Sequence, residues 1–417
     1  MSEITYQNPD VLKQDPYQLP LEELNVAQGE LFQNDSHWSY FERLRNEAPV
    51  HYCKDSEFGP YWSVTKYADI KYVDTNHDLF SSETGIVLGD QDEDFPLPMF
   101  IAMDPPKHDQ QRKEVAGVAG PRNLSALEPT IRERVCAILD SLPVGETFDW
   151  VDRVSIELTT QMLATLFDFP FEDRRKLTRW SDVSTAAPEP GGLIETEEQR
   201  QAELLECLEY FTNLWNQRVN QPPGNDLVSM LAHGESTKNM EPMEYLGNLV
   251  LLIVGGNDTT RNSISGGVLA LNQNPAEYQK LRDNPALIPN MVSEVIRWQT
   301  PLAHMRRLAK VDTELGGQKI KAGDKVAMWY VSGNRDPEMF DDPDAFIIDR
   351  PNARKHIAFG FGIHRCMGNR VAEMQLRILW EEILKRFHTV EVVGDPVRVK
   401  SAFVKGYQEL PVRLHAV

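Results

Sequence analysis

The chain has 417 residues, of which 41% are apolar and 25% are charged, and its formal net charge is −20. This acidity excludes nucleic acid and anionic membrane surfaces as general partners. The four cysteines are not spaced in pairs, which fits a reducing cytoplasm better than a secreted disulfide framework. The polar N-terminal stretch contains no export signal, and the longest apolar run, 249–254, is too short to span a membrane. We therefore expect a cytoplasmic protein without a membrane anchor.

The first elements in chain order are short. Residues 1–35 are polar and contain prolines, which predicts an arm that either lies on the surface or is partly mobile. A helix is predicted over 37–49, where apolar residues recur at helical spacing. Residues 50–65 contain β-branched and aromatic residues on both sides of a glycine-proline break, which predicts a pair of strands.

A long loop is predicted over 82–100, because its prolines and acidic residues are incompatible with a regular helix. Within it, Ile86 and Val87 are expected to face inward. The acidic run at 90–94 leaves two interpretations open: a solvated loop, or part of a functional loop, since long loops in compact domains are often functional.

His108 and Arg112 lie four residues apart in the segment 103–112, which reads M-D-P-P-K-H-D-Q-Q-R. On a helix they would share one face, and their donors could hold a carboxylate between them. From the residues alone, a solvated basic patch is the better interpretation.

Helical periodicity continues over 124–165 and 172–181. A break follows at 186–192, A-A-P-E-P-G-G, before another helix that is predicted over 203–219. The break could be a hinge that opens a binding site, or it could be an ordinary surface loop.

A long helix is predicted over 242–272, and its apolar residues on several faces indicate that it is buried. Its middle contains the polar and helix-weakening run G-G-N-D-T-T at 255–260. A buried carboxylate and buried hydroxyls are costly unless they are paired or used, so Asp258 and Thr259 are candidates for a functional site. Thr259 can hydrogen-bond a backbone carbonyl of the preceding turn. The alternative for Asp258 is a structural ion pair with an arginine.

The last third of the chain contains a further helix and extended segments. Glu294 and Arg297 are spaced so that they can pair on one helical face. An extended segment is predicted over 299–309, and strands are predicted over 399–414 on both sides of a glycine.

Residues 359–368 read F-G-F-G-I-H-R-C-M-G and precede a helix whose apolar residues recur every three or four positions. Cys366 therefore lies where a loop becomes a helix, and the free amides and partial positive charge of a helix N-terminus favour a thiolate there. Glycines in the loop would let a large flat group approach. Three interpretations are open: a packing cysteine, a zinc ligand together with His364, or a thiolate ligand of haem iron.

These ten residues resemble the signature F-x-x-G-x-H-x-C-x-G of the cytochrome P-450 monooxygenases, and further similarity to this family extends over nearly the whole chain. The resemblance implies a mainly α fold with smaller β regions, in which haem lies between a long central helix and the cysteine loop. It also implies a single haem-thiolate monooxygenase domain over 36–417, although the length alone would permit two or three domains.

The resemblance also implies roles for individual residues. Cys366 would be the axial ligand of the iron, Asp258 would relay protons, and Thr259 would steer them to iron-bound oxygen. The residues expected to hold the cysteine loop are Glu294, Arg297 and Arg350. The residues expected to contact haem, some of them through its propionates, are His108, Arg112, Gly255, Arg306, Phe359, His364 and Gly368.

The expected substrate pocket is apolar and would select by shape and apolar area. Its expected lining residues are Ile86, Val87, Leu251, Val254, Leu302, Ala303 and Phe403, although Phe403 could equally be core. Runs such as V-G-G-N-D-T-T-R-N-S and H-M-R-R are similar to the bacterial alkane and fatty-acid terminal hydroxylases. This similarity implies ω-hydroxylation of medium-chain alkanes or fatty acids. Terpenoids or other compact cyclic hydrocarbons are alternative substrates, and a haem-based sensor without turnover is an alternative of another class.

The same resemblance implies the cofactor and the partners. These are haem b (iron protoporphyrin IX), O2, a hydrophobic small-molecule substrate, and electrons from NAD(P)H delivered by an external ferredoxin and ferredoxin reductase. An acidic ferredoxin could dock on basic residues near the cysteine loop. The candidates are Arg112, Lys113, Arg354, Lys355 and Arg365. A peroxide-driven enzyme is a further possibility, but it would leave Asp258 and Thr259 without a role.

Overall fold

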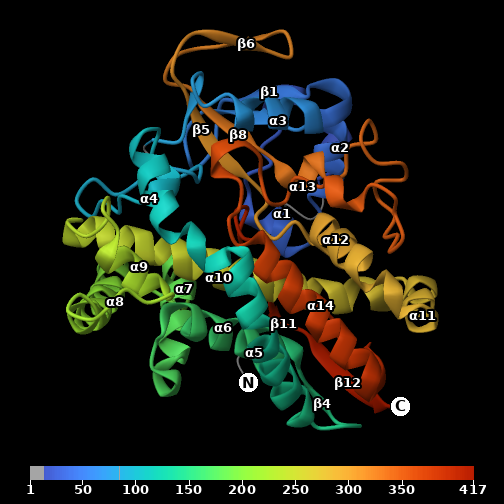
Figure 1. Cartoon of the computed structure of the whole chain (residues 1–417). Helices are drawn as coiled ribbons and strands as arrows, with labels where there is room; N and C mark the ends of the chain where they lie inside the picture. The colour runs from blue at the N-terminus through green and yellow to red at the C-terminus, as the bar shows by residue number, and fades with distance from the viewer. Residues whose placement is uncertain (1–13, 84) are drawn as a thin grey trace.

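The computed structural model describes residues 14–83 and 85–417, and helices make up the larger part of it (Figure 1). The helices in chain order are α1 Gly29–Gln33, α2 Trp38–Glu47, α3 Tyr67–Thr75, α4 Lys107–Val115, α5 Pro121–Asp140, α6 Glu157–Phe167, α7 Arg175–Thr185, α8 Glu197–Arg218, α9 Leu227–His233, α10 Pro242–Gln273, α11 Pro275–Asp283, α12 Ile288–Gln299, α13 Tyr330–Gly333 and α14 Asn369–Arg386. Within the described residues, no helix is both long enough and apolar enough to cross a membrane.

The strands are short and form separate groups: β1, β5 and β8 lie at one end of the molecule, and β4 and β12 lie at the other end beside α5 and α14 (Figure 1). In chain order they are β1 Val50–Cys53, β2 Tyr61–Val64, β3 Phe80–Ser81, β4 Thr147–Asp149, β5 Met305–Ala309, β6 Thr313–Leu315, β7 Gln318–Ile320, β8 Lys325–Met328, β9 Phe387–Val392, β10 Val397–Arg398, β11 Tyr407–Glu409 and β12 Pro411–Ala416. The largest sheet has the order β1-β2-β8-β5-β3, in which β2 and β8 run parallel and the other neighbours run antiparallel. The predicted class, mainly α with smaller β regions, is confirmed.

The helix α10 forms the centre of the helical part and contacts α6, α7, α12 and α14 (Figure 1). Side chains on all its faces are buried, among them Ile253, Ile264 and Leu271. At Gly266, a Cβ would lie 2.3 Å from the Gln299 side chain, so glycine is what allows α12 to pack this closely. The sequence prediction of a long buried helix is confirmed.

The helix α14, which follows the cysteine loop, buries the predicted apolar stripe. Leu376, Leu379 and Ile383 have at most 1% of their surface exposed and pack in one core with residues of α5, α10 and α12. Burying each such side chain contributes about 1.5–3 kcal/mol. The start of α14 is thereby fixed relative to α10.

The predicted strand pair at 50–65, the long loop at 82–100 and the break at 186–192 are confirmed. The single helix predicted over 124–165 is wrong. After α5 the chain contains Pro143 and then Gly145, which has a φ of +81°, and neither is compatible with a continuing helix. After these residues the chain forms β4, which pairs with β12, and then a π-helical turn that leads into α6.

Residues 1–13 of the predicted N-terminal arm lie outside the described residues. In the described remainder, Leu24, Val26 and Phe32 are buried, and the Phe32 ring stacks on Trp329 with the ring centroids 6.2 Å apart. This part of the chain therefore contributes to a hydrophobic core. The domain boundary placed at residue 35 stays a prediction.

Candidate active site

The cysteine loop packs directly against the end of α3. The Cys366 amide donates to the Phe359 carbonyl at 2.8 Å, which closes the loop just before α14 begins. Gly360 and Gly362 both have a φ of +65°, a conformation that L side chains rarely adopt. At Gly362, a Cβ would also lie 2.4 Å from the Asp74 carbonyl oxygen. Glycine is therefore required for the loop to approach α3 this closely.

Two opposing effects act on the Cys366 thiol. Burial is the larger one and raises the pKa of the thiol above its ordinary value. The backbone amides of Gly368 and Asn369 and the guanidinium of Arg112 lower that pKa, as expected just before a helix. The sequence predicted the donors but not the burial. The site therefore holds a neutral thiol by itself and favours the thiolate when a metal cation binds the sulfur.

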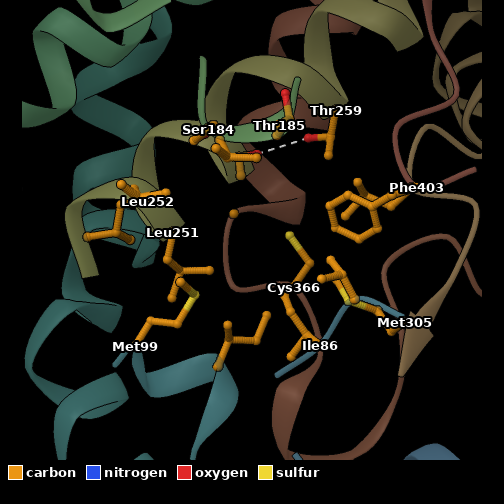
Figure 2. Close-up of a pocket in the computed structure, with 18 of the residues that line it drawn as sticks. Ile86, Met99, Ser184, Thr185, Leu251, Leu252, Thr259, Met305, Cys366 and Phe403 are labelled. Carbon is orange, nitrogen blue, oxygen red and sulfur yellow. Dashed lines mark hydrogen bonds between the residues drawn. The ribbon is translucent and has the colours of Figure 1, made fainter. Parts of the chain in front are cut away.

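The Cys366 side chain points into a cavity of about 470 Å³ (Figure 2). Its sulfur is accessible because it faces this cavity. The walls come from segments that are distant in the sequence: the loop at 85–102, α10, the extended segment at 301–307 and the cysteine loop. Most of the lining side chains are apolar.

On the α10 side of the cavity, Thr259 forms a hydrogen bond within the helix, and Gly255 and Gly256 leave space beside it. Thr259 Oγ1 donates to the Gly255 carbonyl at 2.9 Å, which confirms the local bond predicted from the sequence (Figure 2). A Cβ on Gly256 would lie 2.6 Å from Leu163, so this glycine lets α6 pack against α10. A Cβ on Gly255 would meet nothing within 4 Å, so Gly255 leaves space at the cavity wall.

Asp258 is fully buried and does not line the cavity. Its carboxylate accepts a hydrogen bond from Ser181 at 3.0 Å and lies 3.1 Å from the Arg261 guanidinium, which also pairs with Asp182 at 2.7 Å. Burial raises the pKa of Asp258, and Arg261 opposes this effect. The ion pair considered as an alternative for Asp258 is therefore present.

Thr185, the last residue of α7, connects Asp258 with the cavity. Its Oγ1 lies 3.5 Å from Asp258 Oδ2, at the limit of a hydrogen bond, and the residue lines the cavity beside Ser184 (Figure 2). Sequence reasoning missed Thr185, because a hydroxyl at a helix end is ordinarily a surface or capping group.

Imidazole and guanidinium groups gather near His364 at one side of the cavity. The rings of His108 and His364 are 4.2 Å apart, and Arg112 and Arg307 also act on His364. Burial lowers the pKa of His364 to about 2 and lowers the pKa of His108, so both rings are neutral at pH 7. Among the described residues, nothing hydrogen-bonds Nε2 of His108 or either ring nitrogen of His364. Unpaired buried donors are costly, so this side of the cavity fits an anionic group of a ligand.

The structure corrects the assignment of Arg306 to this cluster. Arg306 bonds Asp90 Oδ1 at 2.8 Å and the Gly85 carbonyl at 3.4 Å, and it does not line the cavity. Its neighbour Arg307 does line it. Successive side chains of a strand point to opposite faces, so only one of the two arginines of β5 can face the ligand.

Asp74 on α3 joins the cysteine loop to Arg307, and sequence reasoning missed it. Its carboxylate accepts hydrogen bonds from the Phe361 amide at 2.6 Å, from Tyr330 at 2.9 Å and from Arg307 at 2.8 Å. Burial raises the pKa of Asp74, and Arg307 lowers it. Asp74 is therefore a positioning residue for both the loop and the arginine.

Most of the predicted substrate-pocket residues line the cavity: Ile86, Val87, Leu251, Val254, Leu302 and Phe403. Ala303 does not, which is a correction. Its amide donates to the Phe403 carbonyl at 2.8 Å, and its side chain is buried in a core that includes Trp329. In an extended segment, Leu302 facing the cavity turns Ala303 away. Apolar lining residues that the sequence did not assign to the pocket include Leu97, Met99, Leu204 and Met305.

The three residues expected to hold the cysteine loop form one buried cluster. Glu294 bonds Arg297 through both oxygens at 2.7 and 2.8 Å, and Arg350 at 3.1 and 3.2 Å. Both arginines also donate to backbone carbonyls of residues 334–345. The cluster thereby fixes the segment that leads into the cysteine loop.

The surroundings of Cys366 fit a haem group. The described residues contain no group of three or more His, Cys, Asp or Glu side chains that could hold a metal ion, which speaks against zinc. A single thiolate would be sufficient for haem iron, because the porphyrin would supply the other protein-independent ligands. The residues that border the cavity around the sulfur and could hold the group are Arg112, Gly255, Arg307, Phe359, His364 and Gly368.

Comparison with known proteins identifies relatives over most of the chain. The sequence profile of the family described as Cytochrome P450 matches residues 131–405. The linalool 8-monooxygenase of Pseudomonas putida is 36% identical over 388 residues, which cover 90% of this chain and 94% of that protein. The methyl-branched lipid omega-hydroxylase of Mycobacterium bovis is 32% identical, with coverages of 89% and 90%. The solved structure of CYP153D17 from Sphingomonas sp. PAMC 26605 is 52% identical and superimposes with a TM-score of 0.89 over 94% of this chain and 98% of that chain.

Proposed function

Because the chain belongs to the cytochrome P450 family and is a monooxygenase of that family, we propose that it hydroxylates the terminal methyl group of medium-chain alkanes and fatty acids. The observation that carries this proposal is the apolar cavity, in which Leu97, Met99, Leu251 and Val254 line the space leading to Cys366. Such a lining offers a chain no polar group to bind along its length. A relative whose name specifies the omega position of a lipid supports attack at the chain end.

The linalool 8-monooxygenase among the relatives favours a second candidate, the hydroxylation of terpenoids. An apolar cavity accepts either class, so the two candidates differ in the shape that fits beside Cys366. A titration followed by the haem absorption separates them. A shift with n-decane but not with linalool supports the first candidate, and the reverse result supports the second.

We expect octane to be oxidised mainly to the primary alcohol by the haem-loaded protein, supplied with NADH, a ferredoxin and its reductase. Terminal C–H bonds are stronger than internal ones, so this outcome requires the cavity to present only the chain end. Gas chromatography of the products is the measurement. A product mixture dominated by internal alcohols would contradict terminal attack.

The family implies haem as the cofactor, and the residues of this chain would hold it as follows. Arg112, Arg307 and His364, which line the cavity, would bind its carboxylates. Nε2 of His108, which does not line the cavity but is unpaired beside His364, would assist them. Bound haem supplies the activation of dioxygen, to which the Cys366 thiolate contributes electron density.

We propose Asp258 as the group that passes protons toward the cavity. Burial raises the pKa of this carboxyl above its ordinary value, and Arg261 with Asp182 links it to the surface. Thr185 and Thr259 present hydroxyls at the cavity wall, and these can orient the delivered proton.

Replacing Thr259 with alanine is expected to lower the product formed per NADH consumed by about tenfold or more, while electron use continues. The variant removes the hydroxyl that is held by the Gly255 carbonyl and leaves the apolar lining intact. The measurement is the ratio of product to NADH consumed, together with the peroxide released. The matched control is Thr212→Ala on α8, since Thr212 makes the same bond to the fourth residue before it, Leu208, at 2.7 Å, and does not line the cavity. Unchanged coupling in T259A would show that Thr259 does not act on the proton.

We propose an external ferredoxin and its reductase as the electron source, because the family resemblance implies them. Basic side chains stand around the cysteine loop despite the overall charge of −20. Lys113, Arg354, Lys355 and Arg365 are exposed, and Arg112 donates to the Arg365 carbonyl. A local basic surface of this kind favours an acidic partner and a rate of association that falls with salt.

A further inference from the structure

Acidic side chains line the solvent-facing end of the cavity. Asp92 of the long loop and Glu197 in the first turn of α8 both line the cavity, and both are exposed to solvent. One and two turns further along α8, Arg200 is half-buried and Leu204 is fully buried. The helix therefore runs from the charged mouth of the cavity, defined by Asp92, Glu197, Arg200 and Gln201, toward its apolar interior.

The carboxylates at and beside this mouth differ in whether a positively charged side chain pairs with them. Asp90, which also borders the cavity, pairs with Arg306 and Lys325 at 2.8 and 2.7 Å. Asp92 accepts hydrogen bonds from Gln201 at 3.0 Å and from the Asp94 amide at 2.9 Å, and neither donor is charged. Within 14–83 and 85–417, no cation pairs with Asp92. Its negative charge at the mouth is therefore not neutralised by a neighbouring side chain.

Arg200, the positively charged residue of the mouth, already has partners within the protein. Arg200 pairs with Glu197 at 3.3 Å and donates to the Ala186 carbonyl. Its Nε is buried and has no hydrogen-bond partner among the described residues. The mouth therefore offers one unused N–H donor and two carboxylates, but no positive charge free to bind an anion.

We infer that this mouth selects substrates whose distal end is neutral, such as alkanes and primary alcohols, over fatty acids. A carboxylate placed there would lose hydration, face the like charge of Asp92 and compete with Glu197 for Arg200. A hydroxyl can accept from Arg200 Nε and donate to a carboxylate, and a methyl group needs no partner. The inference rests on the proposed terminal hydroxylation, because a chain with one end at Cys366 directs its other end toward the mouth.

The test compares decanoate with decanamide, which match in length and shape. The carboxylate is charged and only accepts hydrogen bonds, whereas the amide is neutral and its NH2 group donates them. Binding to the haem-loaded protein is followed by the haem absorption at neutral pH. We expect decanamide to bind at least about tenfold more tightly than decanoate, which corresponds to about 1.4 kcal/mol. In the double variant Asp92→Asn/Glu197→Gln, the dissociation constant of decanoate should fall by about tenfold, and that of decanamide should change by less than about twofold.

The matched control is Asp94→Asn/Glu198→Gln, which removes the same charge from neighbouring exposed positions that do not line the cavity. It is expected to leave both dissociation constants unchanged. Decanoate binding as tightly as decanamide in the unchanged protein would overturn the inference, and so would an equal gain for decanoate in the control. If the double variant does not fold, the two single variants should each give part of the gain, and no gain in either would also overturn it. These binding constants do not depend on which carbon is oxidised, so a failure of terminal hydroxylation is detected separately in the products.

Discussion

Replacing Cys366 with serine is expected to reduce monooxygenase activity to about a thousandth or less, which corresponds to about 4 kcal/mol in the reaction barrier. Cys366 is the sole cysteine among the described residues that line the cavity. A serine hydroxyl would be held by the same amides of Gly368 and Asn369, but it donates far less electron density to a metal than a thiolate does. The loss therefore comes from the ligand atom and not from a changed loop.

The carbon-monoxide difference spectrum of the reduced protein measures this change directly. The long-wavelength band of thiolate-bound haem should disappear in C366S, while haem stays bound through the donors of His108, His364, Arg112 and Arg307. Cys136→Ser is the control, because Cys136 lies on α5 and does not line the cavity. A thiolate spectrum that survives in C366S would show that another sulfur holds the iron.

The features that the sequence predicted well are those set by local pattern. The family resemblance drawn from 359–368 is confirmed by the profile match and by the solved structures. The position of Cys366 between a loop and a helix could be predicted because its loop has few allowed conformations. Gly360 and Gly362 have positive φ angles, and α14 begins directly after the loop. The helices α10 and α14 could be predicted because each has a long apolar period.

The wrong assignments of Arg306 and Ala303 follow an irregular turn. Beyond this turn, the direction of a side chain cannot be extrapolated from the preceding helix. The family resemblance assigned Arg306 to haem, but Thr300, which precedes this segment, has a φ of +40° and ends α12. Beyond such a turn, periodicity no longer fixes which residues face the ligand, and a shift of one residue exchanges the two faces of a strand. The same exchange explains why Leu302 lines the cavity and Ala303 does not.

Other site residues could not be predicted because their partners are distant in the sequence. Asp74 meets Arg307 and the Phe361 amide only after α3 has packed against the cysteine loop. Thr185 reaches Asp258 only through the packing of α7 on α10. A single aspartate or threonine has no local signature for such a contact, so these assignments require the fold.

Glu294→Gln is expected to lower the free energy of unfolding by about 3–5 kcal/mol. From the sequence alone, Glu294 and Arg297 could be an i,i+3 ion pair on a surface helix. Such a pair contributes only about 0.3–0.5 kcal/mol to the stability. The structure shows that this pair is not on the surface, because Glu294 and Arg297 are 0% exposed and Arg350 is 2% exposed. Removing the carboxylate charge leaves two guanidinium ions buried with neutral partners only, and the cost of burying an uncompensated charge far exceeds that of losing an exposed pair.

The measurement is urea unfolding of the haem-loaded protein, followed both by intrinsic fluorescence and by the haem absorption. Glu235→Gln is the matched control, because Glu235 pairs with Lys238 at 2.7 Å at the same spacing but on the surface, and its loss should change the stability by less than about 0.5 kcal/mol. A loss of stability in E294Q as small as in E235Q would contradict the buried-charge argument. Arg350 precedes the cysteine loop and bonds carbonyls of 341–345, so loosening it also loosens the segment that carries Cys366. In E294Q, therefore, the haem absorption should change at a lower urea concentration than the fluorescence.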